Sequence, residues 1–233
     1  MKISLYINPE QEVKRIINFL KSVQKKTGID KVVIGLSGGI DSTTVYYLLQ
    51  KAYKPENIIG VSLPYLTIEP IASQLLSLGE KILPPRLFSE KVRLGNIMTR
   101  VRMIILFDLA KKHNALVCGT ENKSERLLGY FTRFGDAASD IEPISHLYKT
   151  QVYKIAKYLK VPQKIIDAKP TAGLWPGQSD EGEFGFTYKE ADQVLYLYYD
   201  KKLPLDKILF NNVGKIIKRV KDNQFKQEVP YKI

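Results

Sequence analysis

The chain contains very few residues of the kinds on which several classes of protein depend. It has one cysteine, Cys118, and two histidines, His113 and His146, in 233 residues. A single cysteine excludes a disulfide framework and a Cys-based metal cluster within the chain. Two histidines this far apart do not indicate a His metal site, and we assign a catalytic role to neither. Because Cys118 lies in an apolar segment, we expect it to be a buried strand thiol and not a nucleophile.

Long hydrophobic runs are also missing. No segment approaches the roughly 18 apolar residues of a membrane helix, and the N-terminus lacks the apolar stretch of a signal peptide. We therefore expect a soluble, cytoplasmic protein with no membrane partner. The net charge of +12 predicts a surface that attracts anions. Its densest basic cluster, residues 215–221, has apolar residues at helical spacing, which is typical of a solvated helix face, so we predict no nucleic-acid partner.

Two common nucleotide-binding motifs, G-x-G-x-x-G and G-x-x-x-x-G-K-[ST], are absent. A different glycine turn is present, because residues 32–42 read VVIGLSGGIDS. The apolar run predicts a buried strand over 32–36, and the pattern after the turn predicts a helix over 42–50. Successive N–H groups at Gly38 and Gly39 can point at one anion, and the helix dipole adds positive charge there. The segment thus predicts a phosphate-binding loop, and the alternative is an ordinary turn with Ser42 as the helix N-cap.

Two carboxylates indicate a magnesium site. Asp41 would repel bound phosphates unless a divalent cation lay between them, so we predict that it is a metal ligand. Glu125, in the segment GTENKSE, follows a predicted strand over 115–119 and offers a second carboxylate, and Mg²⁺ commonly takes one or two protein oxygens and completes its shell with phosphates and water. The alternative for Glu125 is a capping role in a first helical turn.

The remaining pattern alternates strands and helices. It predicts helices over 9–26, 68–78, 94–113 and 148–159 and a further strand over 58–63. Such alternation implies a parallel sheet whose ligands lie beyond the carboxyl ends of the strands, so the loops after Leu36, Leu63 and Gly119 should converge. Four prolines leave no readable period between residues 64 and 93. The irregular segment 169–185 is long enough to be functional or disordered.

An aromatic block follows the second carboxylate. Residues 129–136 read GYFTRFGD, and Asp140 and Pro143 come soon after. Aromatic rings alternating with a cation and followed by carboxylates suit a planar, charged ligand that carries a sugar, since they supply stacking surfaces and hydroxyl acceptors. A surface aromatic turn is the alternative.

These motifs resemble a known family. The turn SGGIDS resembles the pyrophosphate loop of the N-type ATP pyrophosphatases. The segments GTENKSE, GYFTRFGDAASDIEP, the helix start KTQ and PTAGLWPGQSDE together resemble the ammonia-dependent NAD synthetases, from about Val32 to Ala191. The resemblance implies an α/β fold, a doubly wound parallel sheet flanked by helices (adenine nucleotide alpha hydrolase-like), in a single domain. That domain would comprise an N-terminal helix (9–27), a nucleotide-binding core (31–167), a lid loop over the substrates (169–187) and C-terminal helices (188–223).

The resemblance also implies a reaction and a partner. Deamido-NAD, ATP and ammonia would give NAD, AMP and pyrophosphate through an adenylated intermediate, with Mg²⁺ as cofactor, in a homodimer. Asp41 and Lys149 would be catalytic, and Asp41 and Glu125 would bind magnesium. The ATP-binding residues would be Gly35, Leu36, Ser37, Gly38, Gly39, Ile40, Asp41, Ser42, Thr120, Lys149 and Thr171. The residues that bind deamido-NAD would be Arg100, Arg133, Asp136, Asp140 and Lys226.

The chain departs from this family at one position and leaves other functions open. Family members often carry a His-Lys pair near the C-terminus, where this chain has Phe225 and Lys226. A phenylalanine cannot donate a hydrogen bond, although its ring can stack. The alternatives are another ATP pyrophosphatase acting on tRNA and a nucleotide-binding module that has lost turnover. Ammonia could be free or come from a separate glutaminase.

Overall fold

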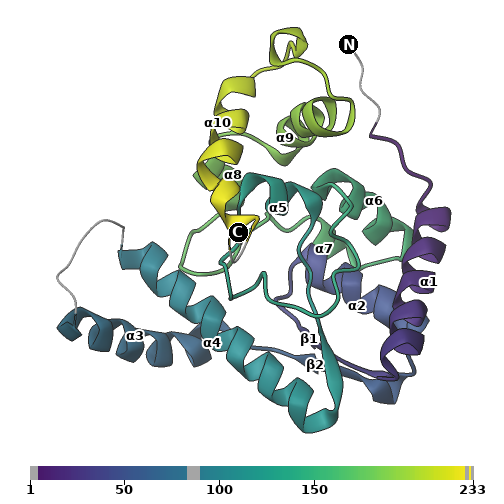
Figure 1. Ribbon diagram of the computed structural model, residues 1–233, viewed down its shortest axis with the longest axis vertical. Coiled ribbons are helices and arrows are strands. Elements are labelled where there is room, and N and C mark those ends of the chain that lie inside the picture. The colour runs from purple at the N-terminus through teal and green to yellow at the C-terminus, as the bar shows by residue number, and fades with distance from the viewer. Residues whose placement is uncertain (1–4, 83–89, 229–230, 232–233) are drawn as a thin grey trace.

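The computed structural model describes residues 5–82, 90–228 and 231, and in this part of the chain it shows one parallel sheet of three strands (Figure 1). Strand β1 (Lys31–Gly35) lies between β2 (Ile58–Val61) and β3 (Ala115–Cys118). Val33 is paired with Ile59 on one side and with Val117 on the other. Its central position explains why β1 is an uninterrupted apolar run, since both of its faces are covered.

Helices cover the sheet and form a second lobe. They are α1 (Pro9–Thr27), α2 (Ile40–Ala52), α3 (Tyr65–Ile82), α4 (Glu90–His113), α5 (Lys123–Leu128), α6 (Lys149–Tyr158), α7 (Gln163–Ile166), α8 (Asp180–Phe184), α9 (Tyr188–Leu195) and α10 (Val213–Asn223). Short 3-10 helices lie at η1 (Pro55–Asn57), η3 (Leu205–Lys207) and η4 (Gln224–Lys226), and a π-helical turn at η2 (Tyr196–Asp200).

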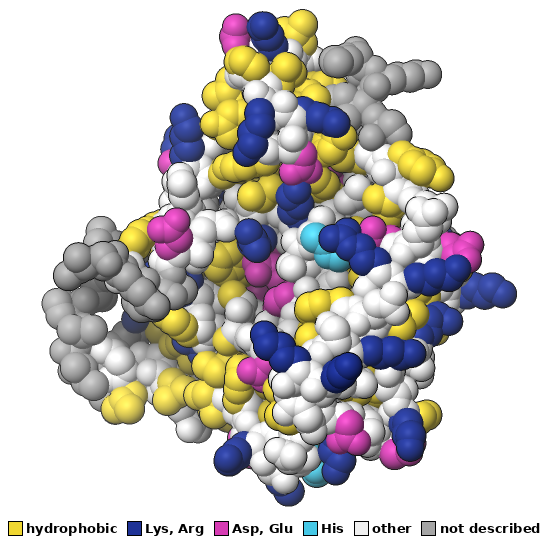
Figure 2. Space-filling model, turned by 45° about the vertical axis from the view of Figure 1, so that its right-hand side comes forward, with side chains coloured by type: hydrophobic (Ala, Val, Ile, Leu, Met, Phe, Trp, Pro, Cys, Tyr) yellow, Lys and Arg dark blue, Asp and Glu magenta, His cyan; other side chains and the backbone are white. Residues whose placement is uncertain are grey.

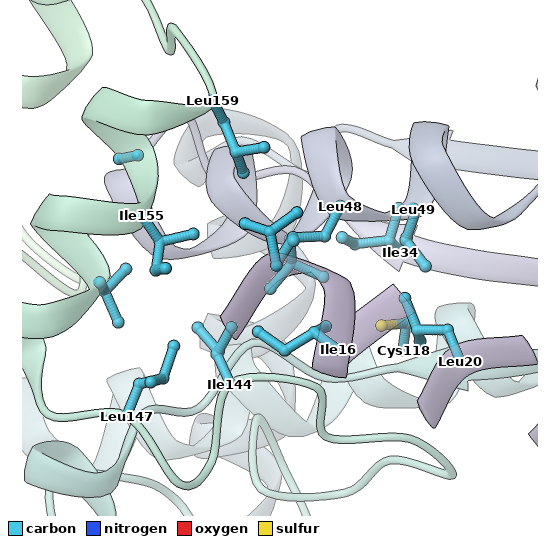
Figure 3. Close-up of a cluster of buried hydrophobic side chains, with 14 of the residues drawn as sticks. Ile16, Leu20, Ile34, Leu48, Leu49, Cys118, Ile144, Leu147, Ile155 and Leu159 are labelled. Carbon is cyan, nitrogen blue, oxygen red and sulfur yellow. The ribbon is translucent and has the colours of Figure 1, made fainter. Parts of the chain in front are cut away.

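Alternate residues of β1 pack into two different cores. Val32 and Ile34 contribute to a large cluster with α1, α2 and α6, part of which is drawn in Figure 3. Val33 points the other way, into a smaller cluster with Ala110 of α4 and Val117 of β3. The predicted doubly wound sheet with helices on both faces is therefore confirmed.

The C-terminal helices pack together beyond the sheet. Buried side chains of α9 and α10 form a third cluster with Leu128 of α5 and Tyr148, the residue before α6. Because α5 follows β3, this lobe lies against the carboxyl edge of the sheet, where the predicted site is located. The lobe is thus placed to support the residues at that edge.

Some element boundaries differ from the sequence prediction. Helix α2 begins at Ile40, two residues before the predicted start, and α3 extends through Pro70. Pro70 has no N–H to donate to the carbonyl of Leu66, so it weakens the helical pattern. Packing of Ile68, Ala72 and neighbouring residues against Met98 and Val101 of α4 compensates for this loss.

The predicted lid segment is not wholly irregular, because it contains α8. The open question on residues 64–93 is answered for most of that stretch by α3 and α4, while 83–89 lie outside the described residues. Within the described ranges, no helix is both long and apolar enough to cross a membrane.

Candidate active site

The glycine turn connects β1 to α2 at the carboxyl edge of the sheet. Gly38 has a φ of +80°, which side-chain-bearing residues rarely adopt, and Gly39 is the N-cap of α2 without a side-chain cap of its own. The alternative of Ser42 as N-cap is therefore wrong. The Ser42 hydroxyl lies 3.0 Å from that of Ser37 and donates to the carbonyl of Gly39. These bonds brace the loop and leave the first N–H groups of α2 directed at an incoming anion.

The other residues of this loop serve it through their backbones. Leu36 donates its N–H to the carbonyl of Val61, which ties the loop to β2. The Ile40 side chain is buried in the main core, so only its backbone can face a ligand. Gly35 ends β1.

Lys149 lies between the two predicted magnesium ligands. Its Nζ donates to Asp41 Oδ2 at 2.5 Å and to Glu125 Oε1 at 2.9 Å. The Lys149 side chain is 3% exposed, whereas each carboxylate is 16% exposed. The predicted convergence of Asp41, Glu125 and Lys149, which come from three different helices, is confirmed. The carboxylates face the open side of the site, and the ammonium lies beneath them.

Electrostatics in this cluster are governed by the ion pairs. Burial alone would lower the pKa of Lys149, but Asp41 and Glu125 outweigh it, so the pKa is raised and the ammonium stays charged. Burial raises the pKa of Glu125, and the Lys149 ammonium opposes that rise. Lys149 therefore stays charged, and its ammonium offsets part of the negative charge of the two carboxylates at the end of the phosphate loop.

Asn122 is a site residue that the sequence reasoning missed. Its Nδ2 donates to Asp41 Oδ1 at 3.0 Å, and its Oδ1 accepts the N–H of Glu125. Glu125 Oε2 in turn accepts the N–H of Asn122, so a capping box starts α5. A capping role does not exclude a role of Glu125 in the site. Its Oε2 caps α5, and its Oε1 accepts from Lys149 Nζ. A capping signal in the sequence could have identified Asn122.

The oxygen donors here suit magnesium. Asp41 and Glu125 share one cation, so their carboxylates lie within reach of a common ligand, and both are hard oxygen donors. Among the described residues, no group of three or more His, Cys, Asp or Glu side chains could hold a metal ion. Any ion at this pair would need further ligands from a substrate or from water, as Mg²⁺ usually does.

The residues predicted to bind a second substrate lie in a separate region formed by α4, the segment 129–140 and η4. Arg100 Nε donates to the carbonyl of Arg133 at 3.3 Å. The Arg133 guanidinium lies 5.1 Å from the centre of the Phe225 ring, and Lys226 Nζ donates to the carbonyls of Gly129 and Phe131. The Phe225 ring therefore stacks on a cation. This arrangement brings Arg100, Arg133 and Lys226 together.

Two carboxylates in this region that were predicted to bind deamido-NAD also accept backbone N–H groups. Asp136 Oδ1 accepts the N–H of Thr132 at 2.8 Å, and Asp140 Oδ2 accepts the N–H of Val117 at the same distance. Asp140 thereby pairs with the outer edge of β3. Both residues lie at the surface, although burial of the Asp136 carboxyl raises its pKa.

The two predicted threonines lie at the rim. Thr120 follows β3 at the carboxyl edge, half-buried. Thr171 is exposed, and its hydroxyl accepts the N–H of Gly173. Within the described part of the chain, no hydrogen bond joins Thr171 to the Lys149 cluster. The structure therefore places Thr120 at the same carboxyl edge of the sheet as the cluster and shows no hydrogen bond from Thr171 to it.

The base of the predicted lid is fixed next to Lys149. The Asp180 N–H donates to the carbonyl of Pro170, and Asp180 Oδ2 accepts the hydroxyl of Tyr188 at 2.9 Å. Lys149 Nζ lies 5.0 Å from the centre of the Tyr188 ring. Sequence reasoning quoted Asp180 only within a motif and missed Tyr188, for which no spacing gave a signal. These contacts connect the lid to the cluster.

A second pair of acidic residues follows β3. Glu142 Oε1 accepts the hydroxyl of Ser139, and Oε2 accepts the N–H of Glu121. A β-carbon at Gly119 would lie 1.8 Å from Glu142 Oε1, so glycine is required for the carboxylate to lie here. Burial, followed by the nearby Glu142, raises the pKa of Glu121 to about 8, and burial raises that of Glu142 to about 7.

These raised pKa values predict how stability depends on pH. Since the folded protein binds these protons more tightly than the unfolded chain, their stabilising contribution is complete below about pH 4.5 and is lost as pH rises through 7 and 8. We expect this contribution to the free energy of unfolding to fall between about pH 4.5 and 8, and to fall less steeply in Glu142→Gln. Urea unfolding across this range tests it, with exposed Glu56→Gln as the control. Equal slopes in all three proteins would contradict the assignment.

Figure 2 shows the basic side chains of one face spread over the surface, not gathered in a band, with acidic side chains in its middle. Cys118 is buried, as predicted, and burial raises the pKa of its thiol. His146 lies 2.7 Å from Glu12 on α1. None of these features competes with the cluster at Lys149 as a reaction centre.

Comparisons with known proteins show the family to which the chain is similar. The family model described as NAD synthase matches residues 12–75 and 65–230. An NH(3)-dependent NAD(+) synthetase of Fusobacterium nucleatum is 41% identical over 97% of this chain and 96% of its own length. The structure of an NMN synthetase from Francisella tularensis is similar with a TM-score of 0.81 and 29% identity, covering 98% of this chain and 99% of that one. An NH3-dependent NAD synthetase from Campylobacter jejuni, solved with a nitrate ion, gives a TM-score of 0.75 at 28% identity, with 97% and 100% coverage.

Proposed function

This chain belongs to the NAD synthase family, and we propose that its site joins ammonia to the nicotinate carboxyl of deamido-NAD at the expense of ATP. It is a ligase that forms a carbon–nitrogen bond. The observation that carries this proposal is the buried Lys149 ammonium held by Asp41 and Glu125 at the end of a glycine turn. That arrangement suits a reaction on ATP phosphates, because the two carboxylates could hold a divalent cation there and Lys149 supplies a fixed ammonium beside it.

The first half-reaction forms the adenylate. An oxygen of the nicotinate carboxylate attacks the α-phosphorus of ATP, and the bond to the β-phosphate oxygen breaks. The backbone N–H groups at the start of α2 and the hydroxyls of Ser37 and Ser42 would bind the phosphates. Lys149 would stabilise the negative charge that grows on pyrophosphate, together with the cation that Asp41 and Glu125 would hold beside it.

Asp41 and Glu125 would hold Mg²⁺ against the same phosphates. When bound, the ion supplies charge neutralisation and orients the leaving pyrophosphate. The two carboxylates are well placed for this role, since they lie on the more open side of Lys149. The presence of both carboxylates argues against the alternative of a nucleotide-binding module that no longer catalyses a reaction.

The second half-reaction needs no covalent protein nucleophile. Ammonia attacks the activated carbonyl carbon, AMP leaves, and the attacking nitrogen loses a proton to give the amide. Arg100, Arg133, Asp136, Asp140 and Lys226 would hold the dinucleotide, with Phe225 backing the Arg133 guanidinium. The segment anchored at Asp180 would act as a lid that limits hydrolysis of the adenylate.

A coupled assay tests this proposal. Purified protein with ATP, Mg²⁺, ammonia and deamido-NAD is expected to form NAD, AMP and pyrophosphate in equal amounts. Omission of any one reactant is expected to abolish NAD formation. Formation of no NAD over a range of pH and temperature would overturn the proposal. Pyrophosphate release that depends on tRNA and not on deamido-NAD would favour the other ATP pyrophosphatase.

A mononucleotide substrate is a second candidate, because the chain resembles an NMN synthetase in structure. The chemistry at the nicotinate carboxyl is the same for both substrates, so the site cluster does not discriminate between them. Parallel assays with nicotinate mononucleotide and deamido-NAD distinguish the two. We expect the higher kcat/KM with deamido-NAD.

We also propose that the chain forms a homodimer through α3 and α4. These helices expose several large apolar side chains, and an unpartnered apolar face of this kind is typical of an interface. On α3, Ile71, Leu75 and Leu78 follow helical spacing and are 46–55% exposed. The others are Leu66, Val92 and Ile104.

A charged residue in this surface is expected to separate the subunits. Sedimentation should show twice the 26.6 kDa chain mass for the wild type and a shift toward monomer for Ile104→Glu, since burying an unpaired carboxylate in an interface is costly. Leu209→Glu, at an apolar residue that is 89% exposed in the C-terminal lobe, is the control and should remain dimeric. A monomeric wild type would contradict the dimer.

A further inference from the structure

Asp192 is a fully buried carboxylate that no step of the proposed reaction uses. It lies on α9, in the C-terminal lobe, and is 0% exposed. A buried carboxylate is costly unless strong hydrogen bonds compensate it. Its partners are therefore informative, and both belong to the elements that carry the reaction cluster.

Each oxygen of Asp192 holds a different helix. Oδ1 accepts the hydroxyl of Ser124 at 2.5 Å, and Ser124 directly precedes Glu125 on α5. Oδ2 accepts the N–H of Thr150 at 2.8 Å, and Thr150 directly follows Lys149 at the start of α6. The Ser124 hydroxyl also accepts the N–H of Lys149 at 2.8 Å. One carboxylate thus fixes the backbones next to both Glu125 and Lys149.

The N-terminus of α6 depends on these partners from elsewhere in the chain. Free N–H groups at a helix start are usually capped by the residue just before the helix. For α6 the first two N–H groups bond instead to Ser124 and Asp192. Asp192 therefore replaces a local cap and places a negative charge against the positive end of the helix dipole.

Helix α9 contacts the other end of Lys149 as well. Tyr188 lies one helical turn before Asp192, on the same face, and its ring lies 5.0 Å from the Lys149 ammonium. Lys149 is thereby held at its backbone through Asp192 and Ser124 and at its charged end by Tyr188, Asp41 and Glu125. A shift of α9 would alter the position of Lys149 relative to Glu125.

We propose that Asp192 is a positioning residue that sets the geometry between Lys149 and Glu125 for the adenylation step. This inference rests on the proposed function, because it assumes that those two residues act on the departing pyrophosphate. The two hydrogen bonds that Asp192 accepts through Oδ1 and Oδ2 go to α5 and α6 and neither goes to the glycine turn, so it should affect the chemical step more than the binding of ATP. A misplacement of about 1 Å can cost up to about a hundredfold in rate.

The test compares Asp192→Asn and Ser124→Ala with the wild type at pH 8. Burial raises the pKa of Asp192 to about 6, so the carboxylate is ionised at that pH. An asparagine has one acceptor oxygen for two donors, so one link is lost. We expect kcat for NAD formation to fall about tenfold or more in each variant, with KM for ATP changed less than about threefold. Asp206→Asn, at an exposed residue of the same lobe, is the control and should match the wild type.

The double variant separates a positioning role from a general loss of stability. If both residues act through one link, Asp192→Asn should lower kcat much less in the Ser124→Ala background than alone. Thermal unfolding fixes an assay temperature at which every protein is folded. A kcat within twofold of wild type for folded Asp192→Asn, or losses that simply multiply in the double variant, would overturn the inference. If Asp192→Asn does not fold, Ser124→Ala provides the test. A kcat within twofold of wild type for that variant would then overturn the inference.

The outcome for the wild type keeps the two proposals distinct. A wild-type protein that makes no NAD refutes the proposed function itself. A wild-type protein that makes NAD while both variants keep its kcat refutes only the role of Asp192.

Discussion

Replacing Asp41 with asparagine is expected to lower kcat for NAD formation by at least about a hundredfold, the scale of losing one important electrostatic stabiliser. The substitution keeps the size of the side chain and an oxygen for the Asn122 amide, but it removes the charge that faces Lys149. A neutral oxygen is also a weaker magnesium ligand, so the Mg²⁺ concentration for half-maximal activity should rise. Initial rates at several Mg²⁺ concentrations measure both effects.

The matched control for this variant is Asp222→Asn. Asp222 pairs with Lys218 on α10, and the pair is largely exposed. It should keep wild-type kcat and Mg²⁺ dependence, since exposed ion pairs contribute little. Near-normal turnover by Asp41→Asn would remove Asp41 from the reaction centre.

Local patterns in the sequence were sufficient to predict the sheet and the two carboxylates of the cluster, whereas Lys149 was predicted from the family resemblance. The apolar run at Val32–Ile34 indicated a central strand, and glycine followed by a carboxylate indicated the phosphate end of that strand. Parallel strands bring their carboxyl ends to one edge, so Asp41 and Glu125 could be expected to meet there. These predictions depended on periodicity and on topology, which a sequence carries directly.

The support for the cluster could not be predicted in the same way. Tyr188 and Asp192 reach Lys149 only because α9 folds back onto α6, a contact between segments about 40 residues apart whose packing no local pattern encodes. The helix predicted over 68–78 was similarly too short, because Pro70 weakens the pattern and tertiary packing maintains the longer helix α3. Buried polar residues that bond to distant backbone groups were therefore the main omission.

Lys149→Met is expected to have the largest effect on both activity and stability. Methionine fills similar space without the ammonium, so the partly buried carboxylates of Asp41 and Glu125 lose their shared cation. Breaking such an arrangement costs about 3–5 kcal/mol, and the loss of positive charge at the departing pyrophosphate should lower kcat by about a thousandfold. Lys157→Met, at an exposed residue of the same helix, is the control and should change neither quantity by much.

The stability loss in Lys149→Met should respond to pH and to magnesium in directions that identify its cause. Burial raises the pKa of Glu125, and loss of the Lys149 ammonium removes the interaction that opposes that rise, so the variant is destabilised least at acidic pH and more as pH rises. The difference in unfolding free energy from wild type should therefore be smaller at pH 5 than at pH 8. Mg²⁺ should raise the melting temperature of the variant more than that of the wild type, because the ion can replace the missing cation between the carboxylates. A deficit that is independent of pH and Mg²⁺ would show that Lys149 contributes packing alone, and the ion-pair account of the site would then fail.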